Sequence, residues 1–173
     1  TGTVNNGGFV VFPGASVSGL NSLVIGAFAG ASDGMAVIFN VDVPTSLTMT
    51  NLTIDVDDIG YGHWSDAKME IAAGDTLVIT GNLTVDEGVL NGGSIEVQGN
   101  AAFNCADATS DCSFGGSTLI SMTGSGNVNL SQATSAVVPG GAFTVGKDNT
   151  TDNVTLLTNF DLDTAGQDLN VTQ

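Results

Sequence analysis

The sequence predicts an all-β protein built as a β-solenoid, a stack of coils made of short strands. The residue types that dominate the chain are Val, Thr, Ile, Gly and Asn, whereas the helix-favouring Glu, Lys, Arg and Gln are rare. Many segments alternate apolar and polar residues with a period of two, as strands with one buried face do. Some of these segments also repeat one another, which is typical of a stacked architecture.

The alternating segments begin near residue 47 and continue almost to the end of the chain. They are 47–50, 52–56, 77–80, 83–85, 95–97, 143–145 and 154–156. Gly or Asn closes these segments, so each predicts a short strand followed by a corner.

The repeat is clearest in the middle of the chain. Residues 77–82 (LVITGN) match 95–100 (IEVQGN) at an offset of 18, and 120–125 (ISMTGS) follow 25 residues later. The second offset is seven residues longer than the first, which is about the size of the segment between Cys105 and Cys112. This segment is therefore predicted to be an insertion between two coils. Glycine at the Gly-Asn and Gly92-Gly93 corners permits a positive φ, and corner asparagines are expected to stack on those of the next coil.

The first 45 residues have a different pattern. Apolar runs at Phe9–Phe12, Leu23–Ile25 and Ala36–Phe39 are continuous rather than alternating, which predicts strands buried on both faces. We interpret 1–14 as an N-terminal arm and 15–173 as one all-β domain, with coils most evident in 45–130. Phe9, Val10, Val11 and Phe12 form either a strand that caps the stack or a donor strand for a neighbouring subunit. The alternative fold is a β-sandwich or jelly roll of a donor-strand filament subunit.

The run Leu77–Asn100, with its "TGNLTV" and "NGGSIEVQGN", resembles repeat regions of bacterial and archaeal surface proteins, such as filamentous-haemagglutinin-like and autotransporter-like adhesins. The likeness covers about residues 45–130 and is compositional. It implies a solenoid architecture and a place on the cell surface.

The charge balance excludes several partners. The 173 residues include 18 acidic residues against two lysines and no arginine, giving a net charge of −16. A protein that binds nucleic acid uses Lys or Arg side chains to displace counterions from the phosphates, so the sequence excludes nucleic acids as partners. No apolar run is long enough for a membrane span.

Two features indicate an extracellular protein. Cys105 and Cys112 can close a loop as a disulfide, although two independent thiols remain the alternative. Six Asn-x-Ser/Thr sequons are candidates for N-glycosylation, with polar turn chemistry as the alternative: Asn51, Asn82, Asn129, Asn149, Asn153 and Asn170. The sequence opens Thr-Gly-Thr-Val without a charged-then-apolar leader, so we expect that a secreted chain has already lost its signal peptide.

The densest acidic cluster is a candidate calcium site. Asp55, Asp57 and Asp58 precede Gly60 and Gly62, and alternate carboxylates followed by glycines suit oxygen ligation of Ca²⁺. A solvated acidic turn is the alternative, and no other cofactor is predicted.

No catalytic residues are predicted. The single His63 lies beside Ser65 and Asp66, but neighbours in sequence seldom converge into a triad, and no nucleophile-elbow motif is present. We expect a structural subunit of an extracellular, glycosylated fibre that assembles with copies of itself. The alternatives are a module of a larger adhesin that binds glycan or a cell surface, and a polysaccharide-active β-helix enzyme.

Overall fold

The structure is a computed structural model of the whole chain. It describes residues 7–11, 20–27, 37–41, 46–56, 67–86, 88–104, 114–133, 143–159 and 169–172. These ranges contain strands and turns and no helix, so none of them holds a helix able to cross a membrane.

The described residues form seventeen strands in three sheets. Sheet A contains β1 (Gly7–Val11), β3 (Val37–Val41), β6 (Ala67–Ile71), β9 (Gly88–Asn91) and β12 (Phe114–Gly115). Sheet B contains β2 (Ser22–Ala27), β5 (Asn51–Val56), β8 (Leu83–Val85), β11 (Ala101–Phe103), β14 (Val128–Gln132) and β16 (Val154–Leu156). Sheet C contains β4 (Ser46–Met49), β7 (Thr76–Ile79), β10 (Ser94–Val97), β13 (Leu119–Met122), β15 (Phe143–Val145) and β17 (Leu169–Val171).

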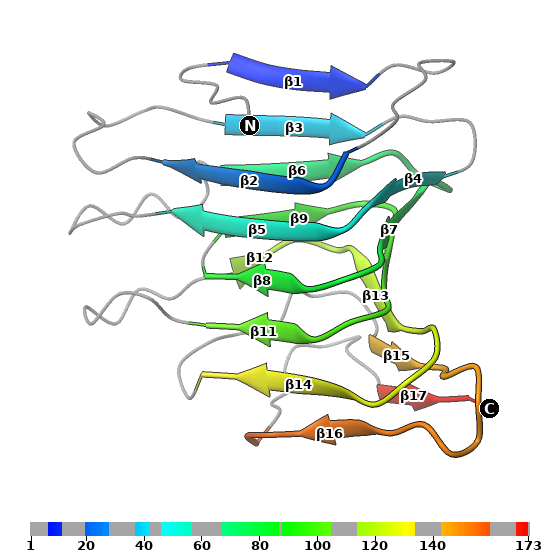
Figure 1. Cartoon of the computed structure of the whole chain (residues 1–173). Coiled ribbons are helices and arrows are strands. Elements are labelled where there is room, and N and C mark those ends of the chain that lie inside the picture. Colours follow the sequence, from blue (N-terminus) through cyan, green and yellow to red (C-terminus); the bar gives the residue numbers. More distant parts are fainter. Residues whose placement is uncertain are drawn as a thin grey trace.

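The chain visits the sheets in turn, and every strand pair is parallel. From β4 to β14 the order is C, B, A in each coil, so strands from successive coils stack in three columns (Figure 1). Parallel strands joined by this winding make a β-solenoid, as the sequence predicts. The β-sandwich alternative is wrong, because sandwiches of that kind are built from antiparallel pairs.

The predicted register of the middle coils is confirmed. Leu77 pairs with Ile95, and Ile95 pairs with Ile120, which are the offsets of 18 and 25 in the sequence. Sheets B and A are joined by residues 86–87 after β8 but by residues 104–113 after β11. The extra residues of the longer coil therefore lie in the segment that contains both cysteines.

The core of the described residues consists of columns of side chains that point inward from sheets B and C, together with Met69, Ile71 and Leu90 from sheet A. The strands alternate buried and partly exposed residues, as β7 and β10 do throughout their length. In sheet B one column runs Leu23, Leu52, Leu83, Ala101, Leu130, Leu156. In sheet C two columns run Leu47, Leu77, Ile95, Ile120, Phe143, Leu169 and Met49, Ile79, Val97, Met122, Val145, Val171. Each coil thus adds one layer to a continuous apolar interior.

The corners use glycine for two different reasons. Gly92 and Gly93 have φ of 72° and 44°, so the expected left-handed corner is confirmed there. Gly81 and Gly99 are absent from the glycines with positive φ, so that expectation is wrong for the Gly-Asn corners. A Cβ on Gly81 would lie 2.6 Å from Asn51 Oδ1 and 2.7 Å from the Thr50 carbonyl oxygen. Close approach of successive coils, rather than backbone handedness, requires glycine at this corner.

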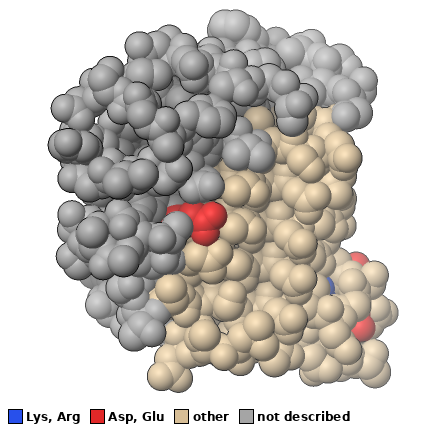
Figure 2. All heavy atoms as spheres, turned by 60° about the vertical axis from the view of Figure 1, so that its left-hand side comes forward, with Lys and Arg blue, Asp and Glu red and all other residues tan. Residues whose placement is uncertain are grey.

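The described surface has few charges. Of the 18 acidic residues, six have described side chains: Glu70, Asp75, Asp86, Glu96, Asp148 and Asp152. Figure 2 shows that the described part of one face consists almost entirely of uncharged side chains. The described outward positions of sheets B and C are mainly Thr, Ser and Asn.

Candidate functional site

The C-terminal end of the stack exposes the apolar columns that are buried elsewhere. In sheet C, Leu169 is 46% exposed and Val171 69% exposed, while in sheet B Leu156 is 50% exposed. The other edge of sheet C differs, because Leu47 and Met49 of β4 are only 4% and 1% exposed. The last described coil is therefore apolar and open on the side where a further coil would stack.

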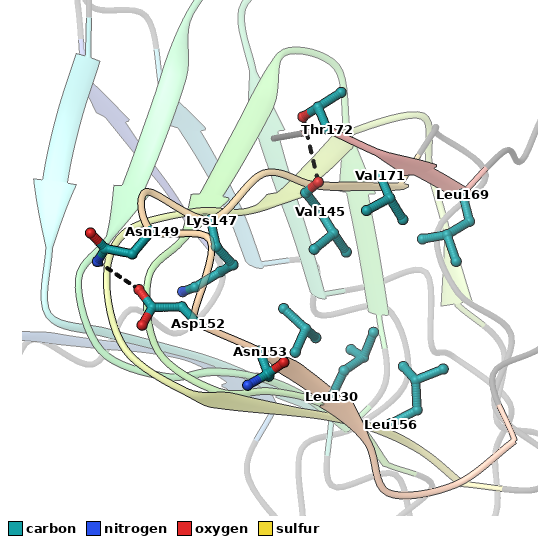
Figure 3. Close-up of a pocket in the computed structure, with 11 residues that line it drawn as sticks. Leu130, Val145, Lys147, Asn149, Asp152, Asn153, Leu156, Leu169, Val171 and Thr172 are labelled. Atoms are coloured by element: carbon teal, nitrogen blue, oxygen red, sulfur yellow. Dashed lines mark hydrogen bonds between the residues drawn. The ribbon is translucent and has the colours of Figure 1, made fainter.

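A groove of about 300 Å³ lies between the last strands of sheets B and C. Figure 3 shows Leu130 and Leu156 on one side and Val145 and Leu169 on the other, with their side chains directed into the same space. These residues continue the interior columns, so the groove is the open end of the solenoid core. Its apolar lining suits apolar side chains from a further coil that packs against β16 and β17.

A polar loop borders the groove. The Asp152 carboxylate accepts hydrogen bonds from Asn149 Nδ2 at 2.8 Å and from the Gly126 N–H at 2.7 Å. The bond from Asn149 is the largest cause of a pKa of Asp152 below its ordinary value of 3.8, and the Gly126 bond and the charge of Lys147 act in the same direction. Lys147 Nζ donates to the Thr123 carbonyl oxygen, which ties this loop to the preceding coil.

The terminal strands lack the features that usually protect a sheet edge. β2 and β16 are the two edges of sheet B, β1 is an edge of sheet A, and β17 is an edge of sheet C. None of these four strands contains a charged residue or a proline. Proteins that avoid edge-to-edge association place Lys, Pro or bulges at such positions. The described residues of these edges therefore include no Lys or Pro that would oppose pairing with another strand.

An asparagine ladder runs along the corner between sheets C and B. Asn51 Oδ1 accepts the Asn82 N–H at 2.9 Å, Asn82 Oδ1 accepts the Asn100 N–H at 3.1 Å, and Asn100 Oδ1 accepts the Asn129 N–H at 2.8 Å. Asn127 Oδ1 likewise accepts the Asn153 N–H at 2.9 Å. Each amide oxygen satisfies a backbone donor of the next coil, so the expected stacking of corner asparagines is confirmed.

All six predicted sequon asparagines are described and lie at the surface. Asn51 is partly exposed, and the other five are exposed: Asn82, Asn129, Asn149, Asn153 and Asn170. Five of the six sequons coincide with a strand or its first residues, where Asn and Ser/Thr face outward around an inward residue. Strand alternation is thus one physical source of these sequons.

Several predicted site residues cannot be placed. Cys105 and Cys112, with the predicted disulfide, lie outside the described residues, as do Asp57, Asp58 and Phe12. Asp55 is the second-last residue of β5, but its side chain is outside the description. Phe9, Val10 and Val11 belong to β1, which pairs in parallel register with β3 of the same chain. Within the described ranges, no group of three His, Cys, Asp or Glu side chains is arranged to hold a metal ion.

Comparisons of this chain with protein-family models, with curated proteins and with solved structures found no match.

The open end is the feature that sequence reasoning missed. Val154–Leu156 and Leu169–Val171 have the same alternating pattern as the buried strands, so the pattern does not reveal that their columns end there. Only the pairing order shows that β16 and β17 are the last described strands of their sheets.

Proposed function

We propose that the chain is a structural subunit of an extracellular fibre, in which copies stack end to end. The observation that carries this proposal is the open C-terminal end, where Leu156, Leu169 and Val171 of three interior columns are about half exposed or more. Completing the burial of each such side chain stabilises a contact by roughly 1 kcal/mol. A further coil laid on this end covers these side chains and, in sheet B, pairs with the free edge of β16.

The N-terminal end of a second copy fits this position by topology. All sheets are parallel, so the C-terminal edge of sheet B is extended in the same direction by β2 of the next copy. In that arrangement Leu23 of β2 follows Leu156 and continues the inward column of sheet B. This contact joins unlike surfaces and does not close on itself, so it generates fibres rather than dimers.

Strand β1 favours stacking over strand exchange. Its five residues pair in register with β3, so the segment Phe9–Val11 already belongs to the first coil of its own chain. Within the described residues β1 is an end strand of sheet A and contains no charged residue or proline. The net charge of −16 opposes association, so salt is expected to promote it by screening.

A matched pair of substitutions tests the proposal. Leu156→Asp places a charge on the open end, whereas Leu119→Asp places one on an outward position of β13 with a similar exposure of 47%. In sedimentation velocity and electron microscopy at moderate salt, we expect the unaltered protein and Leu119→Asp to form fibres and Leu156→Asp to remain a folded monomer.

Two results would overturn parts of this proposal. An unaltered protein that stays monomeric at all salt and protein concentrations excludes self-assembly and favours the second candidate, a module of a larger surface adhesin. Fibres that persist in Leu156→Asp place the contact elsewhere on the chain. The enzymatic alternative requires turnover of a polysaccharide that a single Asp substitution abolishes.

A further inference from the structure

The six sequon asparagines fall into two groups according to what their side-chain amides do. In four of them the amide bonds to the fold. Asn51 and Asn82 belong to the ladder, and Asn51 Nδ2 also lies 3.4 Å from Ser22 Oγ. Asn149 Nδ2 donates to Asp152 at 2.8 Å, and Asn153 Nδ2 donates to the Thr151 carbonyl oxygen at 3.1 Å.

The other two side chains, Asn129 and Asn170, make no hydrogen bond among the described residues. Both are exposed and point outward from strands, Asn129 from β14 in sheet B and Asn170 from β17 in sheet C. In sheet B the ladder ends at Asn129, because the residue paired with it in the next coil is Thr155. Its amide therefore has no backbone donor of a later asparagine to satisfy.

Packing at the corner between sheets C and B is a second difference between the two groups of sequon asparagines. Gly81 lies against Asn51 so closely that a Cβ would come within 2.6 Å of its Oδ1, and a Cβ on Gly99 would lie 3.1 Å from Asn82 Oδ1. The amides of Asn51 and Asn82 are thus held between successive coils. A sugar on either Nδ2 must turn away from the stack without disturbing the oxygen that the next coil needs.

We propose that Asn129 and Asn170 are the N-glycosylation sites of the folded protein, whereas the side chains of Asn51 and Asn82 hold successive coils together and those of Asn149 and Asn153 hold the loop before β16. This assignment rests on the secretion that the proposed function includes. In the reaction, Asn Nδ2 forms a bond to the anomeric carbon of a lipid-linked oligosaccharide. The bond from that carbon to the pyrophosphate oxygen breaks, the pyrophosphate leaves with the electron pair, and one amide proton passes to a base of the transferase.

Site occupancy in protein secreted from a eukaryotic expression host tests the assignment. The folded, secreted fraction is digested with peptide N-glycosidase in water labelled with heavy oxygen, and labelled Asp is located by mass spectrometry. We expect label at positions 129 and 170 and none at 51, 82, 149 or 153. Label at any of the latter four in folded protein overturns the division, and an unlabelled 129 or 170 overturns the assignment of that residue.

Substitutions of the sequon hydroxyl keep every asparagine and provide matched variants. Ser131→Ala is expected to reduce the intact mass by one glycan, whereas Thr84→Ala, the corresponding change at the Asn82 sequon, leaves the intact glycan mass unchanged. Conversely, Asn82→Gln is expected to lower the Tm by about 2–4 °C and Asn129→Gln to leave the Tm of the deglycosylated protein unchanged. A glycan lost in Thr84→Ala contradicts the proposal.

Sedimentation of the same secreted protein separates this proposal from the proposed function. Glycans at Asn129 and Asn170 on a monomer overturn end-to-end assembly alone. Fibres without glycans at either residue overturn the glycosylation sites alone.

Discussion

The middle and the C-terminal end of the solenoid are built from the same columns but differ in what covers them. Leu83, in the middle of the sheet B column, is fully buried, whereas Leu156 at the end of that column is 50% exposed. The local strand pattern is alike in both places. The difference shows that a coil of this fold gains its burial from the coils on both sides, and the last described coil has such a neighbour on one side only.

The largest expected effect tests this comparison directly. Leu83→Ala removes a side chain that is 0% exposed and is expected to lower the free energy of unfolding by about 2–5 kcal/mol. Leu156→Ala, in the same column, is expected to cost less than about 1 kcal/mol, because half of its surface is already in water. Urea unfolding at protein concentrations where both variants are monomeric gives the two values. Equal losses would mean that the end is as well packed as the middle.

A second prediction concerns the close approach of coils at the corners. Gly81→Ala puts a Cβ 2.7 Å from the Thr50 backbone oxygen, which has no room to move, so we expect a loss of about 1–3 kcal/mol. Gly146→Ala is the matched change near the end. Its Cβ meets Thr172 Oγ1 at 2.9 Å, but Thr172 is exposed and its side chain can rotate, so the loss is expected to stay within about 0.5 kcal/mol. Thermal unfolding compares them, and a larger loss for Gly146→Ala would contradict the comparison.

The asparagine ladder gives a third and smaller effect. Asn100→Ala removes the oxygen that accepts the Asn129 N–H at 2.8 Å, and we expect a loss of about 0.5–1.5 kcal/mol. Asn129→Ala removes an exposed amide without a partner and is expected to change the free energy of unfolding by less than about 0.5 kcal/mol. Protein without glycans is used for both, and urea unfolding provides the measurement. If both losses are the same, the ladder contributes nothing specific.

Much of the fold could be predicted from the sequence because its physical causes are local. Alternation with a period of two follows from strand geometry, and the 18-residue match between Leu77 and Ile95 follows from stacking equivalent coils. The assignment of strands to sheets could not be predicted. Successive coils differ in length, from 18 residues between Leu77 and Ile95 to 31 between Leu52 and Leu83, because connecting segments of different length are inserted between the strands.

The candidate site was less predictable for a related reason. The sequons were visible, but an Asn-x-Thr triplet on a strand looks the same whether its amide bonds to the next coil, as in Asn82, or is unpaired, as in Asn129. Likewise, Leu169 and Val171 have the pattern of buried residues, and their exposure depends on there being no described strand beyond β17. Both distinctions depend on the neighbouring coil, which is distant in sequence.

The smallest expected effect is a pH dependence confined to the C-terminal end. Asn149 and the Gly126 N–H lower the pKa of Asp152 below 3.8, so the ionised carboxylate stabilises the loop beside the groove. This stabilisation is fully present above the unfolded-state pKa of about 3.8 and is lost as the pH falls through the lower folded-state value.

The amide resonance of Gly126 should therefore titrate with a midpoint below 3.8, and Asp152→Asn should abolish that step. The resonance of the Asn129 backbone N–H, which donates to the uncharged Asn100 Oδ1 in the ladder, should lack that step. A midpoint of the Gly126 resonance at or above 3.8 would mean that the Asp152 carboxylate does not accept the bonds from Asn149 and Gly126 in solution. The loop beside the groove would then be less ordered than the asparagine ladder of the middle coils.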